Sequence, residues 1–171
     1  MGLDDFDIRR AEARDAHALT ELMRDLHVHL KQADLHITPE SLTRDVLQQG
    51  SVHTVIVAER DGTLLGYALF HETYESITAQ RGVYMADLFV AQEARRKGLG
   101  RALVAAVAYM AREKGLQFVW WVSEAWDEQA QGFYAALGAC HEPMVAHSVS
   151  YESFKSLAEE GKKNPMRVKR S

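Results

Sequence analysis

A group of basic residues and glycines lies in the stretch EARRKGLGRAL, residues 93–103, directly before an apolar segment with helical spacing. The group comprises Arg95, Arg96, Lys97, Gly98, Leu99, Gly100 and Arg101. Basic side chains at a helix N-terminus oppose the helix dipole, whose positive end lies there. The free N–H groups and the dipole attract anions, and glycines let the backbone approach a ligand closely. A bound diphosphate would make this placement favourable, so the stretch predicts a diphosphate-binding loop.

Two common phosphate-binding patterns do not fit this loop. The P-loop pattern requires a glycine, four residues and then Gly-Lys-Ser or Gly-Lys-Thr, which the chain lacks. The dinucleotide pattern G-x-G-x-x-G requires a third glycine where Leu103 stands. On these residues alone, a solvated basic turn without a ligand remains the alternative.

Composition places the chain among ordinary globular proteins. It has 171 residues, 47% of them hydrophobic and 26% charged, which favours a single domain with a sizeable core. No apolar run approaches the roughly 20 residues that span a bilayer, and the stretch MGLDDFD is acidic where a signal peptide is basic. The lone Cys140 agrees with a reducing compartment and cannot build a zinc site. We therefore expect a cytoplasmic protein without a metal.

Charge is distributed unevenly along the chain. Residues 1–160 carry 15 basic and 24 acidic residues, a net charge of −9, whereas residues 161–171 hold five basic residues and no acid. An acidic body repels nucleic acid and attracts a cationic small molecule. We expect one domain over residues 3–160 and a disordered basic tail over 161–171, with a docking role for the tail as the alternative.

Hydrophobic periodicity predicts an alternation of strands and helices. Strands are expected near 6–11, 52–58, 64–70, 82–90 and 117–122, followed by a last hairpin of 139–142 with 145–150. Helices are expected near 15–30, 38–49, 99–114, 128–137 and 153–159. This order predicts a mixed α/β fold, with a mostly antiparallel sheet and one central β-α-β crossover.

Two motifs in this context resemble a known family. Arg95, Gly98 and Gly100 form R-x-x-G-x-G after the strand sequence D-L-F-V, and EAWDEQAQGFYAALGA downstream contains F-Y-x-x-x-G. With the element order over residues 6–151, they resemble the acetyl-CoA signatures of the GNAT acetyltransferases. Within that superfamily the resemblance is to the diamine (spermidine/spermine) and thialysine acetyltransferases. It rests on Tyr74-Glu75, Asp87-Leu88-Phe89-Val90, Trp126-Asp127-Glu128 and Phe133-Tyr134.

The resemblance implies acetyl-CoA as co-substrate and assigns residues to it. Pantetheine contacts fall on the backbone of Leu88, Phe89 and Val90. Pyrophosphate contacts fall on residues 96–101, with Arg95 at the head of the motif. Further contacts are expected from Asp127, Ala130 and Phe133. In such enzymes an amine attacks the thioester directly, while the protein positions the reactants and stabilises the oxyanion.

Tyr134 is the implied proton donor to the departing thiolate. A phenol with a pKa of about 10 can donate to a thiolate whose acid has a pKa of about 8.5. From spacing alone, Tyr134 also fits a packed tyrosine on a stripe with Ala130, Phe133 and Leu137. The two motifs together favour the catalytic role.

The acceptor needs a base, because an alkylammonium has a pKa of about 10.4 and freeing its lone pair at pH 7 costs roughly 4–5 kcal/mol. The resemblance implies a glutamate at the position of Ala86, so the principal acid is missing. Glu75, Asp87 and Glu124 are the candidate replacements, acting through a water, and each also fits a capping or surface carboxylate. A regular strand would point Asp87 to the same side as Val83, Met85 and Phe89.

The N-terminal stretch HVHLKQADLHI, residues 27–37, offers His27, His29 and His36 with Asp34 as its one acid. A polyamine would find few anionic contacts there, so a monoamine or a lysine-like amino acid is at least as good a candidate. Trp120, Trp121 and Trp126 are either pocket or core residues.

Three functions remain open at this stage. The first is acetylation of a small-molecule amine, and the second is acetylation of a protein N-terminus or lysine with the same donor machinery. The third is a non-catalytic acyl-CoA-binding or interaction module, which Ala86 keeps open. A homodimer is implied by the resemblance alone.

Overall fold

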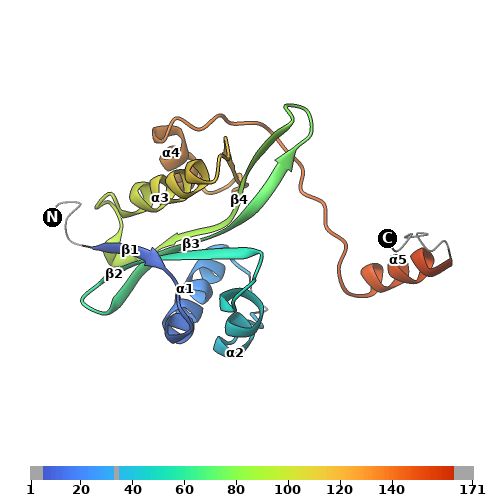
Figure 1. Ribbon diagram of the computed structural model, residues 1–171, viewed down its shortest axis with the longest axis horizontal. Coiled ribbons are helices and arrows are strands. Elements are labelled where there is room, and N and C mark those ends of the chain that lie inside the picture. Colours follow the sequence, from blue (N-terminus) through green and yellow to red (C-terminus); the bar gives the residue numbers. More distant parts are fainter. Residues whose placement is uncertain (1–5, 33–34, 164–171) are drawn as a thin grey trace. The chain divides into compact units, whose positions relative to one another are not determined.

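The computed structural model describes residues 6–32 and 35–163, which fall into two compact units divided between Leu137 and Gly138 (Figure 1). The first unit contains a five-stranded sheet in the order β1-β2-β3-β4-β5, antiparallel except for the parallel pair β4–β5. The strands are β1 (Asp7–Arg10), β2 (His53–Arg60), β3 (Thr63–Glu75), β4 (Gln80–Val90) and β5 (Val119–Trp120). Its helices are α1 (Ala16–His29), α2 (Pro39–Leu42), α3 (Leu99–Glu113) and α4 (Glu128–Ala136). The predicted fold class is confirmed.

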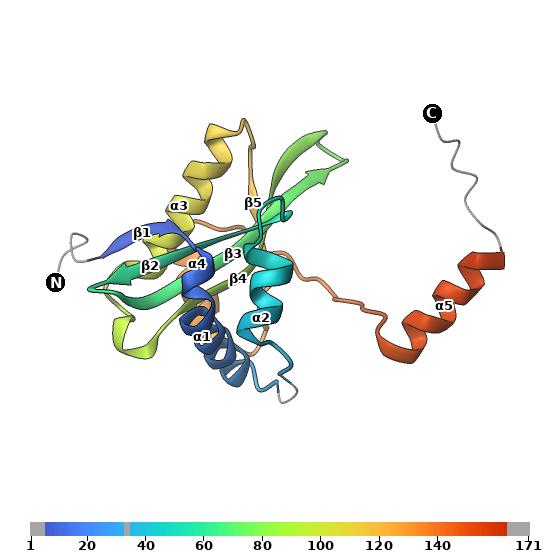
Figure 2. The same ribbon diagram turned by 60° about the horizontal axis from the view of Figure 1, so that its bottom comes forward.

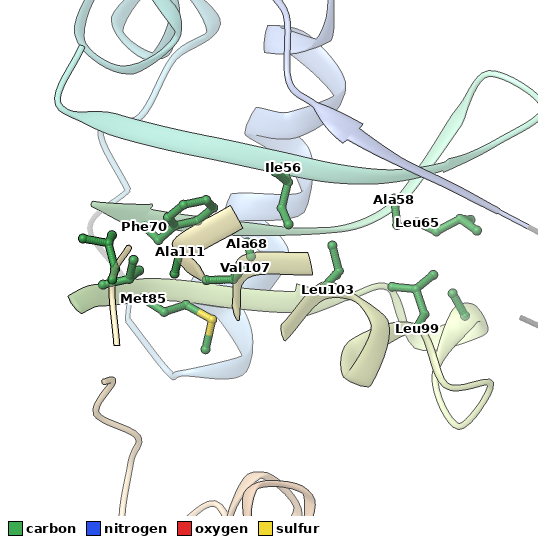
Figure 3. Close-up of a cluster of buried hydrophobic side chains, with 13 residues drawn as sticks. Ile56, Ala58, Leu65, Ala68, Phe70, Met85, Leu99, Leu103, Val107 and Ala111 are labelled. Carbon is green, nitrogen blue, oxygen red and sulfur yellow. The ribbon is translucent and has the colours of Figure 1, made fainter. Parts of the chain in front are cut away.

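Helices cover both faces of the sheet, with α3 on one face and α1 and α2 on the other (Figures 1 and 2). Every fourth residue of α3 is buried against β2, β3 and β4 (Figure 3). These residues are Leu99, Leu103, Val107 and Ala111. On the other face, α1 buries the predicted stripe of Leu19, Leu22, Met23 and Leu26. The sheet therefore holds the ends of α1, β4 and α3 in fixed relation.

Local sequence explains most of the element ends. The predicted β2–β3 hairpin turns at Asp61 and Gly62, both with positive φ, as a tight hairpin turn requires. α3 begins after Gly98 and ends before Gly115, both with left-handed backbone. Thr38 caps α2 through its hydroxyl, but the α-helix ends at Leu42 and a wider turn, η2 (Thr43–Leu47), replaces the rest of the predicted helix.

One extra residue changes the direction of side chains along β4. Leu69 pairs with Asp87 and Phe70 pairs with Met85, so Ala86 has no cross-strand partner and forms a β-bulge. Met85 packs with the α3 face and Phe89 with the α1 face. The expectation that Asp87 points with Met85 was therefore wrong, because a bulge reverses the alternation of sides that a regular strand follows.

The predicted last hairpin is absent, since residues 138–150 contain no strand. An isolated two-stranded hairpin is marginally stable in water, and Met144, Val145 and Val149 are exposed here, so no layer covers such a hairpin. The second unit contains α5 (Tyr151–Lys163), which is longer than the predicted helix. Residues 164–171 of the predicted tail lie outside the described residues, as does Asp34.

Candidate active site

A cavity of about 520 Å³ lies within the first unit, between α1, β4, the loop before α3, and α4. Most of the predicted site residues line it. From β4 and the loop these are Asp87, Leu88, Phe89, Val90, Arg95 and Arg96. From α3 and the region of α4 they are Gly98, Leu99, Gly100, Arg101, Glu124, Asp127, Ala130, Phe133 and Tyr134. The fold thus brings the two sequence motifs to one cavity.

Two basic residues shape the loop before α3. Arg95 Nε donates a hydrogen bond to the Val90 carbonyl at 2.9 Å, and its guanidinium lies 5.5 Å from the centre of the Phe89 ring. Lys97 Nζ donates to the Glu93 carbonyl at 2.7 Å, and Lys97 does not line the cavity. These side chains satisfy backbone carbonyls of the loop and so help to fix its conformation.

The backbone turns sharply into α3 at Arg96 and Gly98, whose φ angles are 60° and 83°. A left-handed conformation costs a non-glycine residue on the order of 1–3 kcal/mol, so Arg96 is held there by its surroundings. The first turn of α3 lines the cavity, and its N–H groups have no acceptor within the helix. A helix start of this kind is an anion site.

The C-terminal end of α4 lies against this first turn of α3. Arg101 Nη1 donates to the Ala136 carbonyl at 3.1 Å. A Cβ added at Gly100 would lie 3.3 Å from the Phe133 ring, a tight contact that Phe133 could relieve only by a small shift, so the close approach of α3 and α4 favours a glycine. We call Arg95, Arg96 and Arg101 the basic end of the cavity.

Acidic groups gather near the N-terminal end of α4. Asp127 Oδ1 accepts a hydrogen bond from the Ala130 N–H at 2.9 Å, and its Oδ2 lies 2.7 Å from His29 Nε2 on α1. Burial raises the pKa of Asp127, but the Ala130 backbone bond and the His29 contact outweigh burial and hold this pKa below its usual range. Glu124 is exposed and also lines the cavity. We call Asp87, Glu124 and Asp127, all of which line the cavity, its acidic end. The nine residues of α4, about 13 Å of helix, separate Asp127 from Ala136.

Asp87 lies on the α1 face as a consequence of the bulge at Ala86. Its Oδ2 accepts a hydrogen bond from the hydroxyl of the fully buried Tyr67 at 3.1 Å. Burial raises the pKa of Asp87, and the Tyr67 bond and the charge of His27 oppose the rise only in part. The carboxylate is thus a stronger base than an exposed aspartate.

Tyr134 lies on the wall that α4 contributes. Its ring centre is 5.0 Å from that of Trp121 and 5.2 Å from that of Phe133. Burial, together with the negative charge of Asp127, raises the pKa of Tyr134 to about 12. The phenol is therefore protonated throughout the physiological range.

The structure does not bring Glu75 to this cavity. Glu75 ends β3 in a hairpin arm that the sequence did not predict, where it pairs with Gln80. Its Oε1 accepts a hydrogen bond from the Ile77 N–H at 2.8 Å. Its carboxylate thus stabilises the turn between β3 and β4.

His29 and Trp121, which the sequence offered as possible pocket residues without a chemical role, also line the cavity. No sequence spacing indicates the His29–Asp127 contact, because the two residues are 98 positions apart. Only the packing of α1 near α4 brings them together. Within residues 6–32 and 35–163, no cluster of three or more histidine, cysteine, aspartate or glutamate residues is arranged to hold a metal ion. In the same part of the chain, no helix is long and apolar enough to span a membrane.

Comparison with known proteins gives the class to which this fold and cavity correspond. The acetyltransferase (GNAT) family model matches residues 16–139, and the chain belongs to this family. The thialysine N-epsilon-acetyltransferase of Bos taurus is similar at 29% identity, over 77% of this chain and 82% of that protein. The L-ornithine N5-acetyltransferase of Arabidopsis thaliana is 38% identical over 46% of this chain and 35% of its own length.

Solved structures support the fold. An integron cassette protein from the mobile metagenome of V. cholerae superposes with a TM-score of 0.76 at 24% identity, covering 91% of this chain and 98% of that one. The predicted family and the resemblance to the thialysine group are confirmed by these comparisons.

Proposed function

We propose that the protein transfers an acetyl group from acetyl-CoA to the primary amine of a small molecule. The observation that carries this proposal is that one cavity has both a basic end, at the start of α3, and an acidic end, formed by residues of β4 and of the region before α4. A polyanionic donor suits the first end and a cationic amine suits the second.

The residues at the basic end fit the diphosphate of CoA. The first turn of α3 offers unused N–H groups, and Arg96 makes no side-chain hydrogen bond or ion pair within the described residues. Gly98 and Gly100 have no side chain, so the diphosphate could approach the backbone closely at these positions. The backbone of Leu88, Phe89 and Val90 would hold the pantetheine arm, as in the family. Acetyl-CoA supplies the activated acyl group, and the protein orients it.

Tyr134 assists departure of the thiolate by hydrogen bonding. Its pKa of about 12 lies above the pKa of a thiol, about 8.5, so complete proton transfer from the phenol is uphill. A hydrogen bond from the phenol to the departing sulfur remains favourable and stabilises the negative charge that develops there. Tyr134 therefore acts mainly as a hydrogen-bond donor.

Asp87, Glu124 and Asp127 attract the acceptor ammonium. The relatives named above act on amino acids with a side-chain amine, which leads us to propose an acceptor of that kind. We extend the proposal to a homodimer and to a cytoplasmic location. Sedimentation of the 19.3 kDa chain would test the former and cell fractionation the latter.

A thermal shift with acetyl-CoA followed by a thiol-release assay tests the proposed function. The amine panel contains L-ornithine, L-lysine, thialysine, spermidine and a lysine-containing peptide. We expect stabilisation by acetyl-CoA and thiol release with at least one small amine. Turnover on the peptide alone would assign a protein acetyltransferase, and stabilisation without any turnover would assign a non-catalytic acyl-CoA-binding module.

A further inference from the structure

A histidine–carboxylate pair joins α1 to the start of α4 inside the cavity. His29 Nε2 lies 2.7 Å from Asp127 Oδ2, and both residues line the cavity. The other oxygen of Asp127 accepts the Ala130 N–H at 2.9 Å, so the carboxylate is fixed from two sides. Among the described residues that line the cavity, His29 is the one imidazole.

The hydrogen bonds determine which nitrogen of His29 is free. The low pKa of Asp127 keeps its carboxylate ionised, and an ionised carboxylate only accepts hydrogen bonds. Nε2 of His29 therefore carries the proton and donates it to Asp127. Nδ1 is left with its lone pair, which is the form of imidazole that accepts a proton near neutral pH.

Other charged groups near His29 fit this arrangement. Asp87 and Glu124 belong to the acidic end, and Tyr134 stays neutral across the physiological range. Lys31 places its ammonium 4.3 Å from the centre of the Trp126 ring. The centre of that ring lies 6.1 Å from the centre of the His29 ring. The acidic groups would attract the acceptor ammonium toward His29, and the ammonium of Lys31 contacts the Trp126 ring.

The other candidate bases are less well placed. Asp87 has one oxygen engaged by Tyr67, and Glu124 is exposed with no side-chain hydrogen bond within the described residues. Glu75 lies outside the cavity. A partly buried imidazole with a fixed orientation is better suited to removing a proton at neutral pH.

We infer that His29, oriented by Asp127, is the general base that deprotonates the acceptor ammonium, an inference that rests on the proposed function. An N–H bond of the ammonium breaks and its proton goes to Nδ1, while Asp127 stabilises the resulting imidazolium. The freed lone pair attacks the thioester carbonyl carbon, a C–N bond forms and the C–S bond breaks. The thiolate leaves with a hydrogen bond from Tyr134 and takes up the second proton of the attacking nitrogen, which gives a neutral amide and a thiol, and the imidazolium then releases its proton to water.

The test is the pH dependence of kcat/KM between pH 6 and 10 for wild type and His29→Gln, with the best amine of the panel. We expect the variant to be slower at pH 7 by about 10²–10³-fold. Its activity should then rise about tenfold per pH unit, because only amine already neutral in solution reacts until the pH nears the amine pKa of about 10.4. The wild type should be flat above neutral pH. The Kd for acetyl-CoA should be unchanged.

Two further variants separate catalysis from folding. Asn is as good a helix N-cap as Asp, so Asp127→Asn keeps the start of α4 but removes the charge beside His29. We expect its Tm to match wild type, while kcat/KM falls about tenfold and the acidic limb moves to lower pH. In His29→Ala, added imidazole should restore part of the activity.

His17→Gln is the matched control, since His17 is exposed on the same helix and does not line the cavity. It should behave as wild type. If wild type turns over an amine and His29→Gln keeps the wild-type pH profile, the inference about His29 is wrong while the proposed function stands. If the acidic limb of the kcat/KM profile is lost in Asp87→Asn and in no other variant, Asp87 rather than His29 is the general base. If wild type releases no thiol with any amine, both proposals fail.

Discussion

The basic end and the acidic end of the cavity differ in how many elements build them. The basic end is mostly one loop and the first turn of α3. Hydrogen bonds in the loop join residues four and five positions apart, as in Lys97–Glu93 and Arg95–Val90, and the Arg101–Ala136 bond reaches α4, 35 positions away. The acidic end joins α1, β4 and α4, with one contact that spans 98 positions. The basic end is thus mainly a local structure, whereas the acidic end depends on tertiary packing. Substitutions should affect the two ends by different routes.

Leu103→Ala should disturb both ends together. Leu103 is fully buried between α3 and the sheet, so its truncation leaves a cavity that costs about 3 kcal/mol of unfolding free energy. Urea denaturation measures the loss, and the exposed Tyr109→Ala on the same helix should change stability by less than about 0.5 kcal/mol. A cost below about 1 kcal/mol would show that α3 is not the common support of the two ends.

Gly100→Asp should disable the basic end alone. A carboxylate at the start of α3 repels the donor diphosphate, and the new Cβ would lie 3.3 Å from the Phe133 ring. We expect the Kd for acetyl-CoA to rise at least about a hundredfold, with a small change in Tm. Calorimetry measures the affinity. Gly132→Asp is the control, because a Cβ at Gly132 meets no atom within 4 Å. Unchanged affinity in Gly100→Asp would refute the diphosphate site.

Tyr134→Phe should act between the two ends. Removing the hydroxyl removes the hydrogen bond to the departing thiolate but keeps the ring between Trp121 and Phe133. We expect kcat to fall about ten- to a hundredfold with unchanged acetyl-CoA affinity. Stopped-flow or steady-state thiol release provides the measurement, with Tyr109→Phe as the exposed control. An unchanged kcat would mean that Tyr134 is only a packed side chain.

Glu124→Gln should weaken the acidic end slightly. Glu124 is exposed, so its attraction for a cationic amine is screened by water and salt. We expect KM for the amine to rise about three- to fivefold at low salt, and less at high salt, with kcat unchanged. Glu113→Gln, exposed near the end of α3, should leave KM unaltered. A change in kcat would place Glu124 in the chemical step.

The contrast between the two ends also explains what sequence could predict. Helix periodicity, the glycines at 98 and 115 and the hairpin turn at Asp61-Gly62 are local signals, and the elements that depend on them formed as predicted. The loop residues of the basic end lie within one stretch, so their type and order were sufficient to predict an anion site. That the anion is CoA diphosphate stays a prediction.

The failures concern features that no local signal encodes. The bulge at Ala86 reversed the side of Asp87, and His29 meets Asp127 only because α1 packs near α4. The hairpin predicted for residues 139–150 has alternating residues but no third strand beside it within its own unit. Strand patterns indicate propensity, whereas pairing requires a partner that a single stretch does not specify.

The bulge at Ala86 determines how this site can vary. Deleting Ala86 would remove the bulge and make Met85 and Asp87 neighbours on opposite faces of a regular strand, so both segments of β4 would keep their faces and their partners on β3. Replacing Ala86 leaves the register intact, because the residue is exposed, lines the cavity and has no cross-strand partner. Position 86 is therefore one at which side-chain size and charge can change the wall of the cavity while β4 keeps its pairing with β3.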